Sequence, residues 1–147
     1  MQSHTSKDLK TILMKNNSNY RTNREFEQFL EGIGGLENGW KADTVPIVQR
    51  GFFSVDNGWL GIIERLITDL IELGWNKQVT QVKEKLGGLR FYINEGHDDI
   101  WKRIQLAEQA SYITCEKCGD LADLRTDIGW HRTLCNEHYE EIKNKIQ

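Results

Sequence analysis

The sequence has no long hydrophobic run, no excess of positive charge and only three cysteines, and each shortage excludes a class of protein. No apolar run is long enough to span a bilayer, and the amino terminus lacks the apolar segment of a signal peptide. The net charge of −3, from 19 basic and 22 acidic residues, argues against a protein held to nucleic acid mainly by phosphate contacts. A chain of 147 residues with 38% apolar and 28% charged residues is typical of a soluble globular protein.

The three cysteines all lie in the last third of the chain, where they form a metal-binding pattern with a histidine. Two residues separate Cys115 from Cys118, two separate Cys135 from His138, and sixteen lie between the pairs. Zinc prefers four tetrahedral sulfur and nitrogen ligands, and two such pairs supply them. We therefore predict a Zn²⁺ site with these four ligands, which leaves no thiol for a disulfide. Because every thiol is then bound to metal, we expect the chain in the reducing cytoplasm.

The fourth ligand has one alternative, since His131 also lies in this segment. We favour His138 because the short spacing lets the start of a helix present Cys135 and His138 to one ion. A site closed by four protein ligands leaves no position for water or a substrate, so we predict a structural metal and not a catalytic one.

The residues around the ligands predict a small lobe made of a tight turn, a hairpin and a helix. Gly119 follows the second ligand and can take a positive φ. Residues 121–125 and 130–134 could pair as a hairpin, and a helix from Asn136 would hold His138 in its first turn. This order resembles a treble-clef zinc finger.

The segment from residue 115 on has a net negative charge, the opposite sign to a DNA-reading finger. It contains five basic and seven acidic residues: Lys117, Arg125, Arg132, Lys143 and Lys145 against Glu116, Asp120, Asp123, Asp127, Glu137, Glu140 and Glu141.

The rest of the chain predicts helices packed on a small antiparallel hairpin, so the expected fold class is α+β. We divide the chain into an N-terminal arm and helical segment at 1–55, an α+β core at 56–113 and the zinc-binding lobe at 114–147. A capping box from Thr22 to Glu25 predicts a helix that ends at Gly34-Gly35. Residues 9–13 could form a short helix in a loosely attached arm of about 20 residues, and residues 45–48 an extended segment.

The strongest helix pattern follows Asp56, a candidate N-cap, and ends at Gly74. Seven large apolar residues form one stripe at helical spacing: Trp59, Ile62, Ile63, Leu66, Ile67, Leu70 and Ile71. We expect this helix to be the centre of the core, because burying each of these side chains contributes about 1.5–3 kcal/mol. A further helix begins at Asp98 or Asp99 and runs directly into the zinc lobe.

Two registers are open for the hairpin between these helices. A two-residue turn at Gly87-Gly88 pairs Lys85 with Arg90, whereas a three-residue turn sets Glu84 against Arg90. We favour the first register because it gathers the apolar residues on the face toward the helix: Val82, Leu86, Phe91 and Ile93.

The opposite face of this hairpin would carry a cationic strip, which we define as Lys83, Lys85, Arg90 and the aromatic Tyr92. Arginine and lysine bind phosphates, and a tyrosine ring offers a stacking surface for a base. Trp101, Glu108 and Ser111 on the following helix could line the other wall. The cationic strip with Trp101 is therefore a candidate site for an anionic, nucleotide-like ligand, and the alternative is a solvated sheet face.

Four motifs together carry a family resemblance. They are Gly58-Trp59 with Ile63-Glu-Arg-Leu66, Gln81-Val-Lys-Glu-Lys-Leu-Gly-Gly-Leu-Arg-Phe-Tyr92, Ala107-Glu108 with Ser111 and Thr114-Cys-Glu-Lys-Cys-Gly119, and Gly129-Trp130 with Thr133-Leu-Cys135 and His138. Over residues 56–140 the chain resembles a family of small proteins carried by bacteriophages and related mobile elements, with a C-terminal Cys-x2-Cys…Cys-x2-His zinc motif. Small accessory phage proteins often act on host machinery, including defence systems. The resemblance therefore implies a host protein or a small signalling molecule as partner, in the host cytoplasm.

Two other functions are open. A zinc lobe with a basic strip could associate with nucleic acid, although the net charge opposes this. Residues 134–143 faintly resemble the zinc-binding end of HNH nucleases, but those enzymes need a further histidine pair, and His4, His97 and His131 are isolated from one another. The signature of zinc deaminases is absent. We therefore favour a zinc-stabilised, non-enzymatic binding protein over an enzyme.

Overall fold

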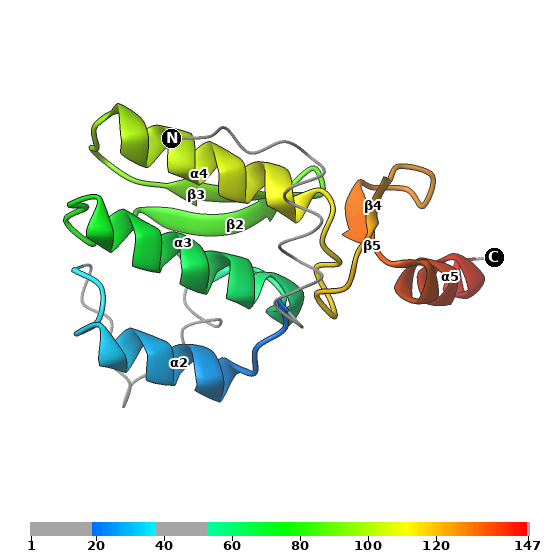
Figure 1. Ribbon diagram of the computed structural model, residues 1–147. Coiled ribbons are helices and arrows are strands. Elements are labelled where there is room, and N and C mark those ends of the chain that lie inside the picture. Colours follow the sequence, from blue (N-terminus) through cyan, green and yellow to red (C-terminus); the bar gives the residue numbers. More distant parts are fainter. Residues whose placement is uncertain (1–18, 38–52, 147) are drawn as a thin grey trace.

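The computed structural model describes residues 19–37 and 53–146, and it shows an α+β protein, as predicted (Figure 1). Among these residues, a three-stranded sheet in the order β1-β2-β3 and a two-stranded sheet, β4-β5, accompany the helices. The elements in chain order are α2 (Asn23–Gly32), β1 (Phe53–Ser54), the 3-10 turn η2 (Asn57–Trp59), α3 (Leu60–Glu72), β2 (Gln81–Lys85), β3 (Gly88–Tyr92), α4 (Asp98–Ser111), β4 (Asp123–Arg125), β5 (Arg132–Leu134) and α5 (Asn136–Lys145).

Helix α2 begins at the predicted capping box. The Glu25 N–H donates to Thr22 Oγ1 at 3.1 Å, and the Thr22 N–H donates to Glu25 Oε1 at 2.9 Å. Phe26 and Leu30 face the core and are fully buried. The helix ends just before Gly34, where the backbone turns to a φ of +84°. The side chains of Thr22 and Glu25 thus accept two of the four N–H groups that lack a partner within the helix at its start, as the sequence pattern predicts.

Helix α3 carries the predicted apolar stripe, but its start differs from our prediction. Asp56 precedes the 3-10 turn η2 and makes no capping bond, and the helix begins at Leu60. The Asp56 carboxylate instead lies 3.3 Å from the Arg132 guanidinium of the C-terminal lobe. Six residues of the stripe are buried, with Ile71 half-buried against them: Trp59, Ile62, Ile63, Leu66, Ile67 and Leu70. The helix ends before Gly74, which has a φ of +92°.

The hairpin of β2 and β3 has a register that differs from both predictions. Lys83 lies opposite Arg90, and the turn consists of Leu86 and Gly87, with φ angles of 54° and 84°. Positive φ at both central residues gives the twist that a two-residue hairpin needs, but leucine rarely adopts it, so the sequence pointed to Gly87-Gly88 instead. Gly88 belongs to β3, where a Cβ would meet the Tyr112 ring at 2.3 Å.

The observed register differs from our favoured one by two residues, which keeps the side chains of β2 and β3 on their predicted faces. Val82, Phe91 and Ile93 are therefore buried, as predicted. Leu86, which we expected inside, is in the turn and 60% exposed.

Two further segments correct the sequence interpretation. Residues 53–54, which we placed in the N-terminal segment outside the α+β core, form β1 and pair in parallel with β2, with Phe53 opposite Val82. Asn19, which we placed in a loosely attached arm, is buried, and its amide donates to the Gly119 carbonyl at 3.2 Å. The predicted helix at 9–13 and the predicted extended segment at 45–48 lie outside the described residues.

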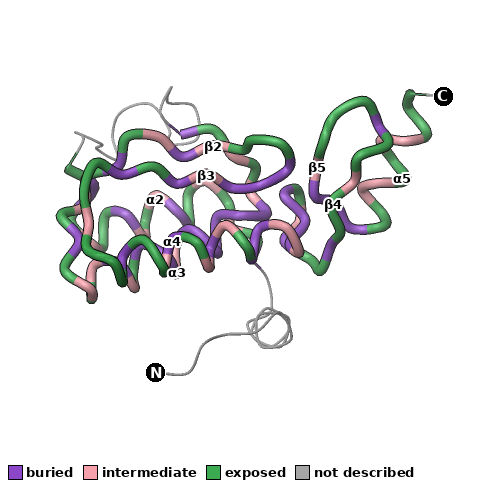
Figure 2. The backbone as a smooth tube through the Cα atoms, turned by 90° about the horizontal axis from the view of Figure 1, so that it is seen from above, coloured by how far each residue is buried: buried purple, intermediate pink, exposed green. Residues whose placement is uncertain are grey.

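The helices α3 and α4 cover one face of the three-stranded sheet, and α2 packs on α3 (Figures 1 and 2). The main core lies between these layers and includes the large buried side chains of α2, α3 and the sheet. A second, smaller cluster lies in the C-terminal lobe, where Cys115, Ala122, Ile128, Leu134 and Cys135 are buried together. The lobe stands at one end of the main body, beyond the carboxyl end of α4 (Figure 1).

Candidate metal centre

The four predicted ligands lie close enough to hold one metal ion. One ligand atom from each of Cys115, Cys118, Cys135 and His138 lies within 4.8 Å of all the others. Cys115 and Cys135 are buried, and the other two are half-buried. His131, the alternative fourth ligand, is exposed and is not part of this group.

Two of the distances between the ligand atoms match those around a tetrahedral zinc ion, and the third is about 0.5 Å shorter. Zinc bonds of about 2.3 Å to sulfur and about 2.0–2.1 Å to nitrogen place two sulfurs about 3.8 Å apart, and sulfur and nitrogen about 3.6 Å apart. The Cys118 and Cys135 sulfurs lie 3.8 Å apart. The His138 Nδ1 atom lies 3.6 Å from the Cys115 sulfur and 3.1 Å from the Cys135 sulfur. The Nδ1 edge of the ring therefore faces the thiols.

The chain builds this group from a tight turn, a hairpin and the start of a helix. The Gly119 N–H donates to the Cys115 carbonyl at 2.8 Å, and Gly119 has the predicted positive φ of +83°. The strands β4 and β5 then return the chain, and Cys135 occupies the N-cap position of α5. His138 follows within the first turn of that helix, as predicted. Short local segments therefore hold each ligand pair, and the β4–β5 hairpin joins the two pairs.

The electrostatics of the group favour a bound cation. Burial raises the pKa of the Cys118 thiol, the Asp120 N–H opposes this rise, and the neighbouring Cys115 and Cys135 thiols add to it. Thiolates, not thiols, bind metal, and ionising several of them side by side is costly without a positive charge between them. A divalent ion supplies that charge. The donor set of three sulfurs and one imidazole fits zinc.

The candidate metal centre is tied to the main body by hydrogen bonds to backbone carbonyls. The Gly58 N–H donates to the Glu116 carbonyl at 2.8 Å, and the Trp59 indole N–H donates to the Thr114 carbonyl at 2.8 Å. On the other side, the Thr133 hydroxyl donates to the Gly87 carbonyl at 2.6 Å. The lobe therefore contacts both the start of the central helix and the turn of the hairpin.

A buried ion pair lies at the same junction. Glu116, between the first two ligands, is 4% exposed and pairs with Arg132 of β5, which also contacts Asp56. Burial raises the pKa of Glu116, the Arg132 guanidinium opposes this rise, and Asp56 and Glu84 add to it. The Oε2 atom of Glu116 is buried and has no hydrogen-bond partner among the described residues.

The structure brings together most of the cationic strip. Lys83 lies directly opposite Arg90, and its amino nitrogen is 6.0 Å from the centroid of the Tyr92 ring. Arg90 donates to the Tyr112 hydroxyl at 3.1 Å, so this tyrosine, which sequence reasoning missed, belongs to the same surface. Lys85 and Tyr92 are exposed, while Lys83 and Arg90 are half-buried. Tyr112 directly follows α4, and no periodic signal linked it to β3.

The residues predicted for the opposite wall have other contacts. The Trp101 indole N–H donates to the Gly96 carbonyl at 2.7 Å. Ser111 is fully buried, accepts the Leu89 N–H at 2.9 Å and donates to the Glu108 carbonyl at 2.5 Å, so it serves the fold. Burial raises the pKa of Glu108, and the charge of Arg90 opposes this rise.

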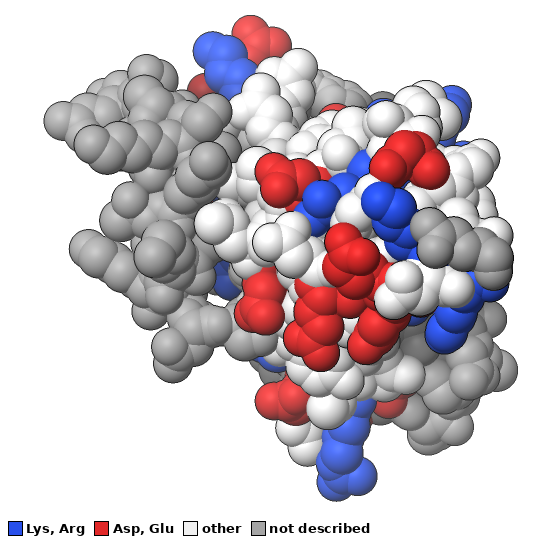
Figure 3. Space-filling model, turned by 90° about the vertical axis from the view of Figure 1, so that its right-hand side faces the viewer, with Lys and Arg blue, Asp and Glu red and all other residues white. Residues whose placement is uncertain are grey.

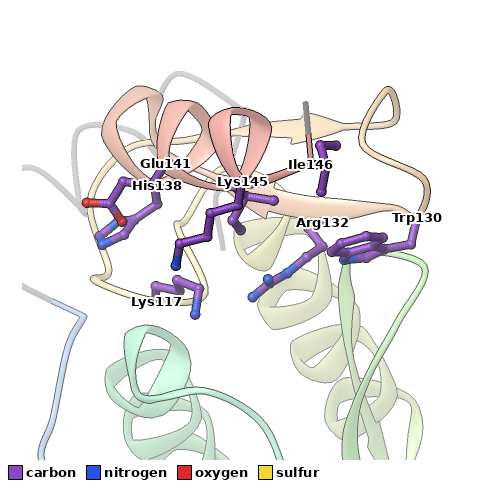
Figure 4. Close-up of a pocket in the computed structure, with 8 residues that line it drawn as sticks. Lys117, Trp130, Arg132, His138, Glu141, Lys145 and Ile146 are labelled. Atoms are coloured by element: carbon purple, nitrogen blue, oxygen red, sulfur yellow. The ribbon is translucent and has the colours of Figure 1, made fainter.

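Two surface hollows border the lobe and share Trp130 and Arg132. One, the His138 hollow, has a volume of about 500 Å³, and Figure 4 shows the side chains of Lys117, Lys145 and Arg132 directed into it. The other, the junction hollow, has a volume of about 390 Å³, and its lining includes Asp56, Glu84, Glu116, Trp130 and Arg132. Sequence reasoning missed both hollows, because their walls come from segments far apart in the chain.

The lobe presents an acidic face. Figure 3, which views the molecule from the side of α5, shows acidic side chains gathered near the centre with basic ones around them. This agrees with the excess of acidic residues counted from residue 115 on.

None of the helices in the described part of the chain combines the length and the apolar character needed to cross a bilayer. Comparison of the chain with models of protein families, with curated proteins and with solved structures found no match.

Proposed function

We propose that the chain is a non-enzymatic binding protein whose C-terminal lobe is held by a structural Zn²⁺ ion. The observation that carries this proposal is the closed group of Cys115, Cys118, Cys135 and His138. Four protein ligands complete a tetrahedral zinc shell, so the ion has no open position for water or a substrate. The turn, hairpin and ligand-bearing helix follow the order of a treble-clef finger, and we interpret the lobe as that type.

The cationic strip supports an anionic, nucleotide-like ligand. Like charges directly opposite one another destabilise a strand pair, and Lys83 and Arg90 are placed in this way. A phosphate between them would replace repulsion with charge-assisted hydrogen bonds. Tyr92 is 38% exposed, so its ring could stack on a base.

The family resemblance adds a proposal on origin and partner. We propose that the chain is encoded by a bacteriophage or a related mobile element and acts in the host cytoplasm. Its partner is then either a nucleotide-like signal of a defence system or a host defence protein. A nucleic-acid partner is disfavoured, because the lobe is acidic and a phosphate-binding surface needs the opposite sign.

A thermal-shift screen of nucleotides against the zinc-loaded chain tests the ligand. We expect a nucleotide to raise the melting temperature of the natural sequence and to lose this effect when Lys83→Ala and Arg90→Ala are combined. The combined Arg24→Ala and Lys102→Ala variant removes the same charge from exposed positions and is the matched control. If no nucleotide raises the melting temperature of the natural sequence, the nucleotide proposal fails, while zinc analysis of the same sample tests the metal separately.

A further inference from the structure

The junction hollow lies where the metal centre meets the main body, and three carboxylates line it. Asp56 precedes the central helix, Glu84 comes from β2, and Glu116 comes from the turn between the first two metal ligands. Arg132 of β5 is the one guanidinium among the lining residues. Three negative charges against one positive charge leave an excess of two negative charges around the hollow. Segments far apart in the sequence therefore converge to build an anionic site.

Each carboxylate has one oxygen engaged in the fold. Asp56 and Glu116 both contact Arg132, and Glu84 Oε2 accepts the Gly87 N–H at 2.7 Å. Glu116 differs from the other two carboxylates because it is buried, with 4% of its surface exposed. Its Oε2 atom nevertheless has no hydrogen-bond partner among the described residues. A buried carboxylate oxygen without a donor has lost its hydration and gained no hydrogen bond in return, which destabilises the folded state. A cationic donor entering the hollow would offer this carboxylate a partner and would reduce the excess negative charge.

The aromatic wall of the hollow favours an organic cation over a hydrated metal ion. Trp130 lines the hollow, and its side chain is 49% exposed. An indole face attracts guanidinium and ammonium groups, and it also packs against the aliphatic stem that carries them. A guanidinium entering the hollow would lie among the three carboxylates that line it, Asp56, Glu84 and Glu116.

We propose that the junction hollow binds an organic cation, a guanidinium or ammonium group on an aliphatic stem. The hollow opens to the surface, so the source that fits it best is an arginine or lysine side chain of a partner protein; a free amine shares the same chemistry. This inference does not depend on the nucleotide proposal, because the cationic strip uses other residues on the outer face of the hairpin.

The test uses the zinc-loaded full-length chain labelled with ¹⁵N. It is titrated with N-acetyl-arginine amide and, as the uncharged isostere, with N-acetyl-citrulline amide. We expect saturable shifts of the Trp130 indole signal and of the Glu84 and Glu116 amide signals with the arginine compound only, with a dissociation constant in about the millimolar range for a single side chain. These shifts should weaken as salt is added.

Two variants and two controls locate the site. Glu84→Gln keeps an acceptor for the Gly87 N–H but removes the charge, and Trp130→Ala removes an exposed ring, so both should retain the fold and the zinc. We expect each to weaken binding by about tenfold. Glu137→Gln on α5 and Trp101→Ala on α4 change the same residue types at exposed positions and should leave binding unchanged.

A short peptide with one arginine between glycines distinguishes the two sources. Binding of the peptide at least as tight as that of the amide supports a protein side chain, whereas binding of the amide alone supports a small free cation at the same site. Equal shifts with the citrulline compound, no shifts at saturating arginine amide, or unchanged binding in both variants would overturn the proposal.

Discussion

The backbone N–H of Gly58 donates to the carbonyl of Glu116 at 2.8 Å, which joins the start of the central helix to the turn that holds the first two metal ligands. A Cβ atom at position 58 would lie 2.2 Å from the Cys115 carbonyl, so only glycine permits this approach. The metal centre and the core are therefore packed as one unit. Removal of the metal should therefore also disturb the structure at the start of α3.

Gly58→Ala should destabilise the chain because the methyl group must push the metal-binding turn away from α3. We expect a loss of about 2–4 kcal/mol in the free energy of unfolding, in the range of strongly overpacked core sites. Urea denaturation of zinc-loaded protein measures it. Gly32→Ala is the matched control, because a Cβ atom at position 32 of α2 would have nothing within 4 Å. This variant should stabilise the chain by about 0.5–1 kcal/mol. Equal stabilities for the two variants would show that the approach is not tight.

His138→Ala should weaken zinc binding far more than His131→Ala. The His138 Nδ1 atom faces the thiols, whereas His131 is exposed outside the group. Removing a direct ligand should cost more than the about 10–100-fold loss typical of a residue that only supports a ligand. Competition with a chromogenic chelator measures the affinity of each variant. A normal affinity in His138→Ala together with a loss in His131→Ala would assign the fourth ligand to His131.

Leu86→Asn should stabilise the β2–β3 hairpin. Leu86 has a φ of 54° and is 60% exposed, so it bears backbone strain and contributes little burial. Asparagine before glycine is favoured in a turn of this type, and we expect a gain of about 0.5–1 kcal/mol in the free energy of unfolding. Gly87→Ala should have the opposite effect, because it combines a φ of +84° with a Cβ 2.4 Å from Leu124. Urea denaturation compares both variants, and a destabilised Leu86→Asn would contradict the observed register.

Glu108→Gln should raise the free energy of unfolding at neutral pH and make it less dependent on pH. Burial raises the pKa of Glu108 in the folded state, although Arg90 opposes the rise. Because the folded-state pKa lies above the unfolded value of about 4.3, ionised Glu108 costs stability, and the natural sequence regains it as pH falls through the folded-state pKa. The difference in unfolding free energy between variant and natural sequence should shrink from pH 7 toward pH 4. Glu31→Gln at an exposed position of α2 is the control, and a constant difference for Glu108→Gln would refute the shift.

The features predicted from the sequence are those set by local spacing. The capping box at Thr22, the stripe of α3 and the ligand pairs of the metal centre all depend on residues a few positions apart, and the structure contains each of them. A short spacing fixes the local geometry directly, so these predictions needed no knowledge of the tertiary fold.

The features missed are those set by tertiary contacts. Leu86 adopts a positive φ because β3 must begin at Gly88, where Tyr112 packs too closely for a side chain. β1 has only two residues and exists because β2 lies beside it. The junction hollow joins Asp56 to Arg132, 76 positions apart, and no sequence pattern links them. Such contacts depend on how the layers pack.

We propose that one zinc ion, held by Cys115, Cys118, Cys135 and His138, completes the fold. Native mass spectrometry with elemental analysis of the purified chain tests it most directly, before and after treatment with a strong chelator. We predict one zinc per folded chain and, after chelation, loss of ordered signals from the lobe and a lower melting temperature. A chain that is fully folded without metal, with an unchanged melting temperature after chelation, would contradict the account.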